Sequence, residues 1–383
     1  MKSVQILSSL DAEAAGPSYT VPGLARALID QGHEAEVHTL GQPGSVIDQG
    51  LQITRHAPDP VLLPILERLG RSRGMRSALL KSDAAVFHSH GLWMMPNVYP
   101  GIAAQLLRRP FVLAPRGMLG REAMQFSPCA KRVFLALWQA RSLSRVSCFH
   151  ATAESEYEDI REFGLSQPVA IVPNGIDLPP LVPQDRLELE KDGPFVLSLG
   201  RVHRKKGLDR LISAFALVAA EYPQWSLRIV GPDEGGYSEQ LKNQIQQSGL
   251  SGRVSIELSV FGEKKFSLMR QARVFALSTL HENFGMTVAE SLAVETPVIS
   301  THGAPWSGLA EHRCGWWVAH GPEPMAAALR EAMLMPSETL RSMGAAGRDW
   351  MARDFAWEGI GAKMSATYKW LHGIGPQPAW VHA

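Results

Sequence analysis

The chain has 383 residues, of which 45% are hydrophobic and 20% charged, and its formal net charge at pH 7 is +1. This length suits two domains rather than one compact core, the charge gives no support to bulk nucleic-acid binding, and no apolar run approaches the ~18 residues of a membrane-spanning helix. Three widely spaced cysteines, and a start that runs directly from Met1 into a short strand, predict a cytoplasmic protein without disulfide bonds or signal peptide.

The N-terminal half is predicted to begin with a β-α-β unit. Residues 4–7 form an apolar strand, residues 21–31 a helix and residues 35–38 the next strand. The small-residue loop 11–18 follows the first strand at the edge of the sheet where open α/β folds bind ligands. This loop contains Gly16, and a plain strand-to-helix turn explains it equally well.

Two further strand ends in this half carry polar residues. The strand 84–87 ends in a His-Ser-His-Gly run at residues 88–91, and Arg116 follows the strand 111–114. An isolated histidine is more often structural than functional, but two at one strand end favour a functional role for His90. The role of His88 stays open. Arg116 is interpreted either as an acceptor contact or as part of a structural salt bridge.

Two stretches of the N-terminal half combine basic and apolar residues. They cover residues 61–82 and the predicted helix 131–144. A basic amphipathic surface can lie on an anionic membrane. The alternative is that these residues only make two ordinary helices soluble, and the near-neutral net charge agrees better with that alternative.

The second half starts after a proline-rich linker, for which residues 179–194 are the best candidate. A new strand at 195–199 leads into the basic loop 200–207 and a helix from residue 208. Basic residues just before a helix oppose the helix dipole, which favours acids there. A bound anion would offset both, and the loop therefore predicts an anion site.

A second anion site is predicted where the apolar strand 274–277 is followed by a polar loop and a helix. Gly285 allows close approach to the backbone, and the first N–H groups of the helix lie at the positive end of its dipole. Glu282 and Glu290 bracket this site, and eight residues of helical rise separate them by roughly 10 Å. A nucleoside-diphosphate sugar has a matching layout, although a lone pair of glutamates at this spacing is usually solvated.

Taken together, these motifs resemble those of the retaining glycosyltransferases of family four, also called group 1. The resemblance covers essentially the whole chain. It rests on the Glu-Asn-Phe-Gly run at 282–285 with Glu290 and Thr-Pro-Val-Ile at 296–299, on Gly-Arg at 200–201 with Lys-Gly at 206–207, on residues 88–91, and on Pro-Asn-Gly-Ile-Asp at 173–177. At residues 15–17 the family usually carries Gly-Gly-Pro, and only Gly16 of this chain matches it fully.

The resemblance implies the GT-B fold, an α/β class with two facing Rossmann-like domains and a cleft between them. The expected division is an acceptor-binding domain at 1–180, a linker at 181–194, a nucleotide-sugar-binding domain at 195–354, and a C-terminal helix at 355–383 that crosses back to the first domain.

The resemblance also assigns roles to single residues. His90 contacts the transferred sugar near the reaction centre, Glu282 holds sugar hydroxyls, and Arg116 lies on the acceptor side. The expected donor-binding residues are Gly16, Arg201, Lys206, Asn283, Phe284, Gly285 and Glu290, the last of which holds the ribose. Arg204 and Lys205 are interpreted as solvated. The donor is a UDP- or GDP-linked sugar, no cofactor is needed, and the acceptor is a glycan, a glycolipid or a small molecule.

The expected function is therefore retaining transfer of a sugar to an acceptor hydroxyl in bacterial polysaccharide, lipopolysaccharide or glycolipid synthesis, in the cytoplasm or at the inner face of the membrane. No Asp-x-Asp pair occurs in the chain, which predicts activity without a metal ion. The alternatives are a sugar-nucleotide epimerase of the same fold and a non-catalytic nucleotide-sugar-binding module. A NAD dehydrogenase is disfavoured because residues 10–18 lack a Gly-x-Gly-x-x-Gly loop.

Overall fold

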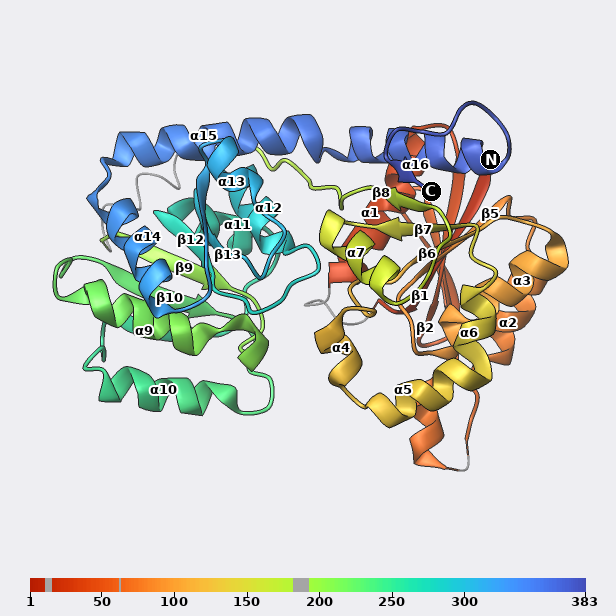
Figure 1. Ribbon diagram of the computed structural model, residues 1–383, viewed down its shortest axis with the longest axis horizontal. Helices are drawn as coiled ribbons and strands as arrows, with labels where there is room; N and C mark the ends of the chain where they lie inside the picture. Colours follow the sequence, from red (N-terminus) through yellow and green to blue (C-terminus); the bar gives the residue numbers. More distant parts are fainter. Residues whose placement is uncertain (11–15, 62, 182–192) are drawn as a thin grey trace. The chain divides into compact units, whose positions relative to one another are not determined.

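The computed structural model describes residues 1–10, 16–61, 63–181 and 193–383, and it divides the chain into two compact units (Figure 1). Unit 1 comprises Met1–Gly175 and Trp357–Ala383, and unit 2 comprises Ile176–Ala356. Most of the predicted proline-rich linker and most of the loop before Gly16 lie outside the described residues.

The described part of unit 1 contains a nine-stranded sheet with the spatial order β15-β8-β7-β6-β5-β1-β2-β4-β3. Its strands are β1 (Lys2–Ser9), β2 (Glu34–Leu40), β3 (Gly44–Asp48), β4 (Leu51–His56), β5 (Val86–His90), β6 (Phe111–Ala114), β7 (Cys148–Ala151), β8 (Val169–Ile171) and β15 (Val381–His382). All neighbours are parallel except the pairs β3–β4 and β8–β15. The strand order reverses between β1 and β5, which is the topological switch point where such sheets bind ligands.

Helices cover both faces of this sheet. They are α1 (Gly16–Asp30), η1 (Pro64–Leu69), α2 (Arg73–Leu80), η2 (Met95–Asn97), α3 (Tyr99–Leu107), α4 (Arg121–Gln125), α5 (Pro128–Phe134), the π-helical turn η3 (Leu135–Gln139), α6 (Ala140–Leu143), α7 (Glu154–Glu162) and α16 (Trp357–Leu371). On one face, α16 packs against α1 (Figure 1), with Leu24, Leu28, Ile360 and Met364 in a shared core. The C-terminal segment is therefore an integral part of unit 1.

Unit 2 is built on a parallel sheet with the spatial order β11-β10-β9-β12-β13-β14. Its strands are β9 (Phe195–Leu199), β10 (Ser226–Val230), β11 (Val254–Glu257), β12 (Val274–Leu277), β13 (Val298–Thr301) and β14 (Gly315–Val318). Its helices are η5 (Arg204–Lys206), α9 (Leu208–Ala219), α10 (Tyr237–Gln247), α11 (Gly262–Gln271), α12 (Met286–Ala293), α13 (Gly308–Glu311), α14 (Pro322–Leu334) and α15 (Ser337–Asp354). The strand numbers run outward from β9 and β12, as in dinucleotide-binding folds, so the switch point lies between these two strands.

The structure corrects several predicted elements. Helix α1 begins at Gly16, five residues before the predicted start, and the stretch 61–82 is divided into η1 and α2. The predicted helix 131–144 is interrupted by the π-helical turn η3. The β3–β4 hairpin was not predicted; its turn holds Gln49 and Gly50 at φ values of 49° and 80°. In the parts of the chain that the structure covers, every helix is too short or too polar to span a lipid bilayer.

Candidate functional site

The loops that follow β9 and β12 meet at the switch point of unit 2 and are fastened to each other. The Oγ of Ser278 donates to the carbonyl of Lys206 at 2.8 Å, and Thr279 Oγ1 donates to the carbonyl of Lys205 at 3.1 Å. Gly207 has φ +59°, and a Cβ there would lie 2.3 Å from the Ser278 carbonyl oxygen. Only glycine fits this close approach, so the basic loop is held in place by backbone and hydroxyl contacts.

An ion pair between Lys206 and Glu282 lies at this junction. The two side chains are 20% and 25% exposed, so the pair is accessible without being fully solvated. The Glu282 amide donates to the Gly303 carbonyl at 2.7 Å, which fixes the backbone beneath the carboxylate. The structure therefore brings together two of the residues predicted for the donor site.

The start of α12 lies directly after this pair. Gly285 has φ +82° and forms the N-cap. Because glycine has no side chain, no N-cap side chain accepts a hydrogen bond from the first amides of the helix. Asn283 beside it is half-buried. Phe284 is only 6% exposed; its ring lies edge-on to Trp306, whose indole N–H donates to the Phe284 carbonyl. The ring of Phe284 therefore belongs to the core, and the prediction that this residue binds the donor concerns its backbone.

Glu290 faces a different cation. It is buried on α12, and its Oε1 accepts from the Nζ of Lys265 on α11 at 2.7 Å. Burial raises the pKa of Glu290, and the Lys265 ammonium partly offsets that rise. A solvated surface acid is thus excluded, and each of the two glutamates that bracket the helix start has its own lysine.

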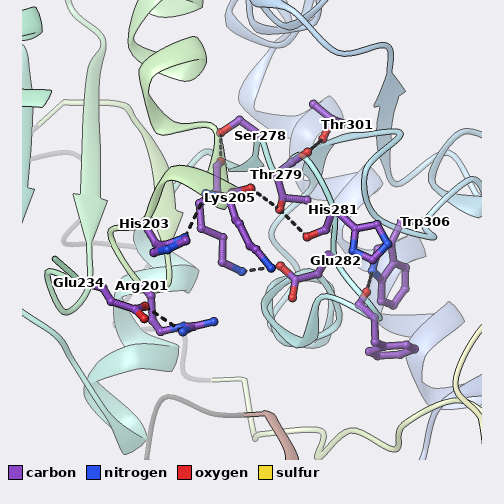
Figure 2. Close-up of polar contacts among 12 residues, drawn as sticks. Arg201, His203, Lys205, Glu234, Ser278, Thr279, His281, Glu282, Thr301 and Trp306 are labelled. Atoms are coloured by element: carbon purple, nitrogen blue, oxygen red, sulfur yellow. Dashed lines mark hydrogen bonds and ion pairs between the residues drawn. The ribbon is translucent and has the colours of Figure 1, made fainter. Parts of the chain in front are cut away.

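Arg201 is paired with a different carboxylate from Lys206. Its guanidinium forms an ion pair with Glu234 at 2.8 Å, and its side chain is 51% exposed (Figure 2). Arg204, interpreted from the sequence as solvated, is exposed; it donates to Gln240 at 2.8 Å and lies over the ring of Tyr237. The structure therefore places one predicted donor cation with Glu282 and the other at a solvent-exposed pair.

At the switch point of unit 1, His90 is buried and both of its ring nitrogens have partners. Its Nε2 lies 2.9 Å from Gln5 Oε1, and its Nδ1 lies 3.0 Å from a terminal nitrogen of Arg116. The ring is only 3% exposed. Both ring nitrogens are therefore bonded inside unit 1 in this structure, and the contact of His90 with the transferred sugar stays a prediction.

His88 continues this buried network toward the C-terminal helix. Its Nδ1 lies 2.7 Å from the hydroxyl of Tyr368 on α16, and its Nε2 lies 3.3 Å from Nδ1 of His150. The Nε2 of His150 lies 2.8 Å from the Val172 carbonyl. Burial lowers the pKa of all three histidines, that of His150 to about 3, so the rings are neutral at pH 7.

Arg116 is the charged end of the network. Its two terminal nitrogens bond to His90 and to Asn174 Oδ1, the latter at 2.7 Å, and both partners are neutral. Burial lowers its pKa to about 10 against the opposing charge of Glu156, so it remains a cation at neutral pH. Its Nε has no hydrogen-bond partner among the described residues. A left-handed backbone at φ +57° turns the residue out of the strand end.

The remaining residues divide into those that were predicted and those that were missed. Gly16 is the first residue of α1, and a Cβ there would meet open space. Gln5, His150, Tyr368 and Lys265 belong to the two polar networks and were not singled out from the sequence. No local signal in the sequence would have found Lys265, whose partner Glu290 lies 25 residues away, or Tyr368, whose partner His88 lies 280 residues away.

Comparison with known proteins agrees with this arrangement. The family model for "Glycosyl transferase 4-like domain" matches residues 15–175, and the model for "Glycosyl transferases group 1" matches residues 184–350. A D-inositol 3-phosphate glycosyltransferase of Jonesia denitrificans is 25% identical over 93% of this chain and 91% of its own length. A GDP-mannose:cellobiosyl-diphosphopolyprenol alpha-mannosyltransferase of Xanthomonas oryzae is 26% identical over 65% of each chain.

Among solved structures, sucrose-phosphate synthase from Thermosynechococcus elongatus superposes with a TM-score of 0.79 at 20% identity, covering 98% of this chain and 100% of that one. This similarity confirms the GT-B fold class that the sequence motifs imply. The two family models follow one another along nearly the whole chain and agree with the motifs at both switch points. The chain therefore belongs to the group 1 glycosyltransferases of family four.

Proposed function

We propose that the protein transfers a sugar from a UDP- or GDP-linked donor to an acceptor hydroxyl with retention of anomeric configuration and without a metal ion. The observation that carries this proposal is the accessible Lys206–Glu282 pair at the β9–β12 switch point, directly before the start of α12. Ligands of Rossmann-like sheets bind at such a point, and a helix start favours phosphate.

In this proposal each group at the site has a role when the donor binds. The ammonium of Lys206 moves from Glu282 to the leaving diphosphate, and the first amides of α12 bind the same oxygens. Glu282 is then free to accept hydrogen bonds from the sugar hydroxyls. Glu290, which Lys265 keeps compensated, accepts from the ribose. Lys206 and the helix start supply most of the positive charge that other glycosyltransferases take from a divalent cation, and Arg201, which is paired with Glu234, adds a smaller share.

The acceptor is proposed to carry a phosphate and an apolar group. Arg116 offers a cation at the switch point of unit 1, and the names of both sequence relatives include phosphorylated acceptors. Around α5 and η3, Phe126, Val133 and Leu137 are each more than half exposed, beside the exposed Arg132 and Arg141. This basic and apolar surface fits an anionic bilayer, so we place the enzyme at the inner face of the membrane, in polysaccharide, lipopolysaccharide or glycolipid synthesis.

The test is a donor and acceptor screen with product analysis. UDP- and GDP-sugars are each incubated with D-inositol 3-phosphate or with a polyprenyl-diphosphate saccharide, and products are identified by mass and by NMR of the anomeric proton. A glycoside with the donor's anomeric configuration supports the proposal. Release of an epimerised sugar, or donor binding without turnover of any acceptor, would instead support the epimerase or the binding module.

Membrane contact has its own test. Each basic side chain near an anionic bilayer contributes about 1 kcal/mol, so co-sedimentation with phosphatidylglycerol vesicles is expected at low salt and not at high salt. The charge reversal Arg132→Glu with Arg141→Glu should abolish pelleting. The matched control, Lys264→Glu with Arg341→Glu at exposed positions of unit 2 outside both basic and apolar stretches, should leave it unchanged. Equal behaviour of both pairs would argue for a soluble acceptor.

A further inference from the structure

Six side chains of unit 1 form one unbroken hydrogen-bonded chain, which we call the histidine chain. In order they are His150, His88, Tyr368, Gln5, His90 and Arg116, and their links measure 3.3, 2.7, 3.2, 2.9 and 3.0 Å. The Val172 carbonyl closes one end at 2.8 Å, and the Asn174 side chain closes the other at 2.7 Å. The first five side chains are buried, so their hydrogen bonds are made within the protein rather than to bulk water.

The Val172 end determines the protons of the first two histidines. A carbonyl only accepts, so His150 carries its proton on Nε2, and its Nδ1 must accept because the ring is neutral. His88 therefore donates from Nε2 and has only an acceptor left at Nδ1. It follows that the hydroxyl of Tyr368 donates to His88.

The Arg116 end determines the remaining protons independently. A guanidinium only donates, so Nδ1 of His90 accepts and its Nε2 carries the proton, which it donates to Gln5 Oε1. The amide nitrogen of Gln5 then donates to the Tyr368 oxygen. The Tyr368 hydroxyl therefore gives its proton to His88 and accepts from Gln5. No conflict of donors or acceptors arises anywhere along the chain.

We propose that Tyr368, although it lies on the C-terminal helix, is a positioning residue for His90 and Arg116. Because its proton is committed to His88, its oxygen can only accept, and this fixes the orientation of the Gln5 amide. That orientation holds His90 with its proton on Nε2 and its Nδ1 lone pair toward Arg116. Without the hydroxyl, only Arg116 still opposes a flip of the Gln5 amide. In the flipped state His90 carries its proton on Nδ1, and two donors face each other at Arg116.

The proton order itself is tested by two-bond ¹H–¹⁵N spectra of the wild-type protein labelled at histidine, with signals assigned from single His→Gln variants. His88, His90 and His150 are expected as neutral Nε2–H tautomers from pH 8 down to pH 6. An Nδ1–H form, or a charged ring at pH 7, in any of the three would overturn the proposal. This measurement needs neither donor nor acceptor, so it stands even if the proposed function fails.

The positioning role is tested with Tyr368→Phe against Tyr99→Phe, a buried tyrosine of the same unit whose hydroxyl instead accepts from the Ser72 amide. Tyr368→Phe should give His90 a second tautomer and raise the KM for the acceptor found in the screen by about tenfold. The Kd of the donor nucleotide should stay within twofold, since that site lies in unit 2. Tyr99→Phe should leave both properties unchanged. A Tyr368→Phe protein that keeps the wild-type His90 signal and acceptor KM would show that the hydroxyl is only structural.

Discussion

At the switch point of unit 2, charged side chains stand in ion pairs that are partly open to solvent, as Lys206 with Glu282 shows. At the switch point of unit 1, most of the polar side chains are neutral, buried and bonded to one another. Partly exposed pairs contribute little to stability and can exchange partners when a charged ligand arrives. A buried network is stable only when all of its members are satisfied. The first region is therefore suited to ligand exchange and the second to holding a fixed geometry.

Lowering the pH is expected to have the largest effect, because it reduces the stability that the buried histidines of unit 1 contribute. The folded-state pKa values of His88, His90 and His150 lie below the ordinary value of 6.5, so the unfolded chain binds more protons below that pH. The stability contributed by these neutral rings is fully present above pH 6.5 and is lost as the pH falls. For each pH unit of acidification below 6.5, each of these rings lowers the free energy of unfolding by up to about 1.4 kcal/mol.

The measurement is urea unfolding of the whole chain between pH 7.5 and pH 5. His150→Gln, which removes one titrating ring, should reduce the slope by roughly a fifth, because burial also lowers the pKa of His33 and His56. A free energy of unfolding that does not change over this range would contradict the assignment of neutral buried histidines.

The next largest effect is expected for Glu282→Gln. The variant keeps its size but loses the charge that holds sugar hydroxyls, so turnover should fall about a hundredfold, equivalent to roughly 2.7 kcal/mol. UDP or GDP without a sugar should bind within about threefold of wild type. Steady-state kinetics and titration calorimetry measure the two quantities. Glu239→Gln, at an exposed pair with Lys242, is the matched control, and near-wild-type turnover of Glu282→Gln would remove Glu282 from the site.

A comparison within unit 2 is expected to give a smaller difference. Lys206→Met removes a partly buried cation beside the helix start and should weaken nucleotide-diphosphate binding about ten- to a hundredfold, from ~1.5–3 kcal/mol per charge-assisted hydrogen bond. Arg201→Met removes a cation that is half exposed and already paired with Glu234, so the loss should be about threefold or less. Titration calorimetry with UDP and GDP measures the affinity of each variant. Equal losses of affinity in the two variants would show that Arg201 leaves Glu234 and binds the donor.

Removal of metal ions should have the smallest effect. If lysine, arginine and the start of α12 supply the positive charge, activity in EDTA should equal that of the untreated enzyme. The check is the transfer rate before and after EDTA, followed by addition of Mg²⁺ or Mn²⁺. Activity that is lost and then restored by either ion would refute metal independence.

Much of the donor-side arrangement follows from local sequence. Gly207 and Gly285 mark backbone positions with positive φ after two apolar strands, and the strand order brings those two loops together. The pairing of Lys206 with Glu282 joins residues 76 positions apart, and Lys265 with Glu290 joins residues 25 apart. Such pairs need the fold, because the sequence shows both charges without showing which ones meet.

The interior of unit 1 was harder to predict. The two histidines at the end of β5 were visible, but whether their nitrogens are free depends on Gln5 and on Tyr368, which comes from the other end of the chain. The π-helical turn η3 also escaped prediction, since its residues carry an ordinary helical pattern. The Gln49–Gly50 turn was missed because both of its central residues have a positive φ. Glycine indicates such a conformation in a sequence, but glutamine does not.

The burial pattern of the three cysteines gives the native chain a single site for chemical labelling. Cys129 is exposed on α5, within the basic and apolar surface proposed to touch lipid, whereas Cys148 and Cys314 are buried. Burial raises the pKa of both buried thiols to about 12, and thiols alkylate only as thiolates. A maleimide dye at neutral pH will therefore attach to Cys129 alone, without any mutation. A polarity-sensitive dye at that position would turn membrane docking into a fluorescence signal that can be followed in real time.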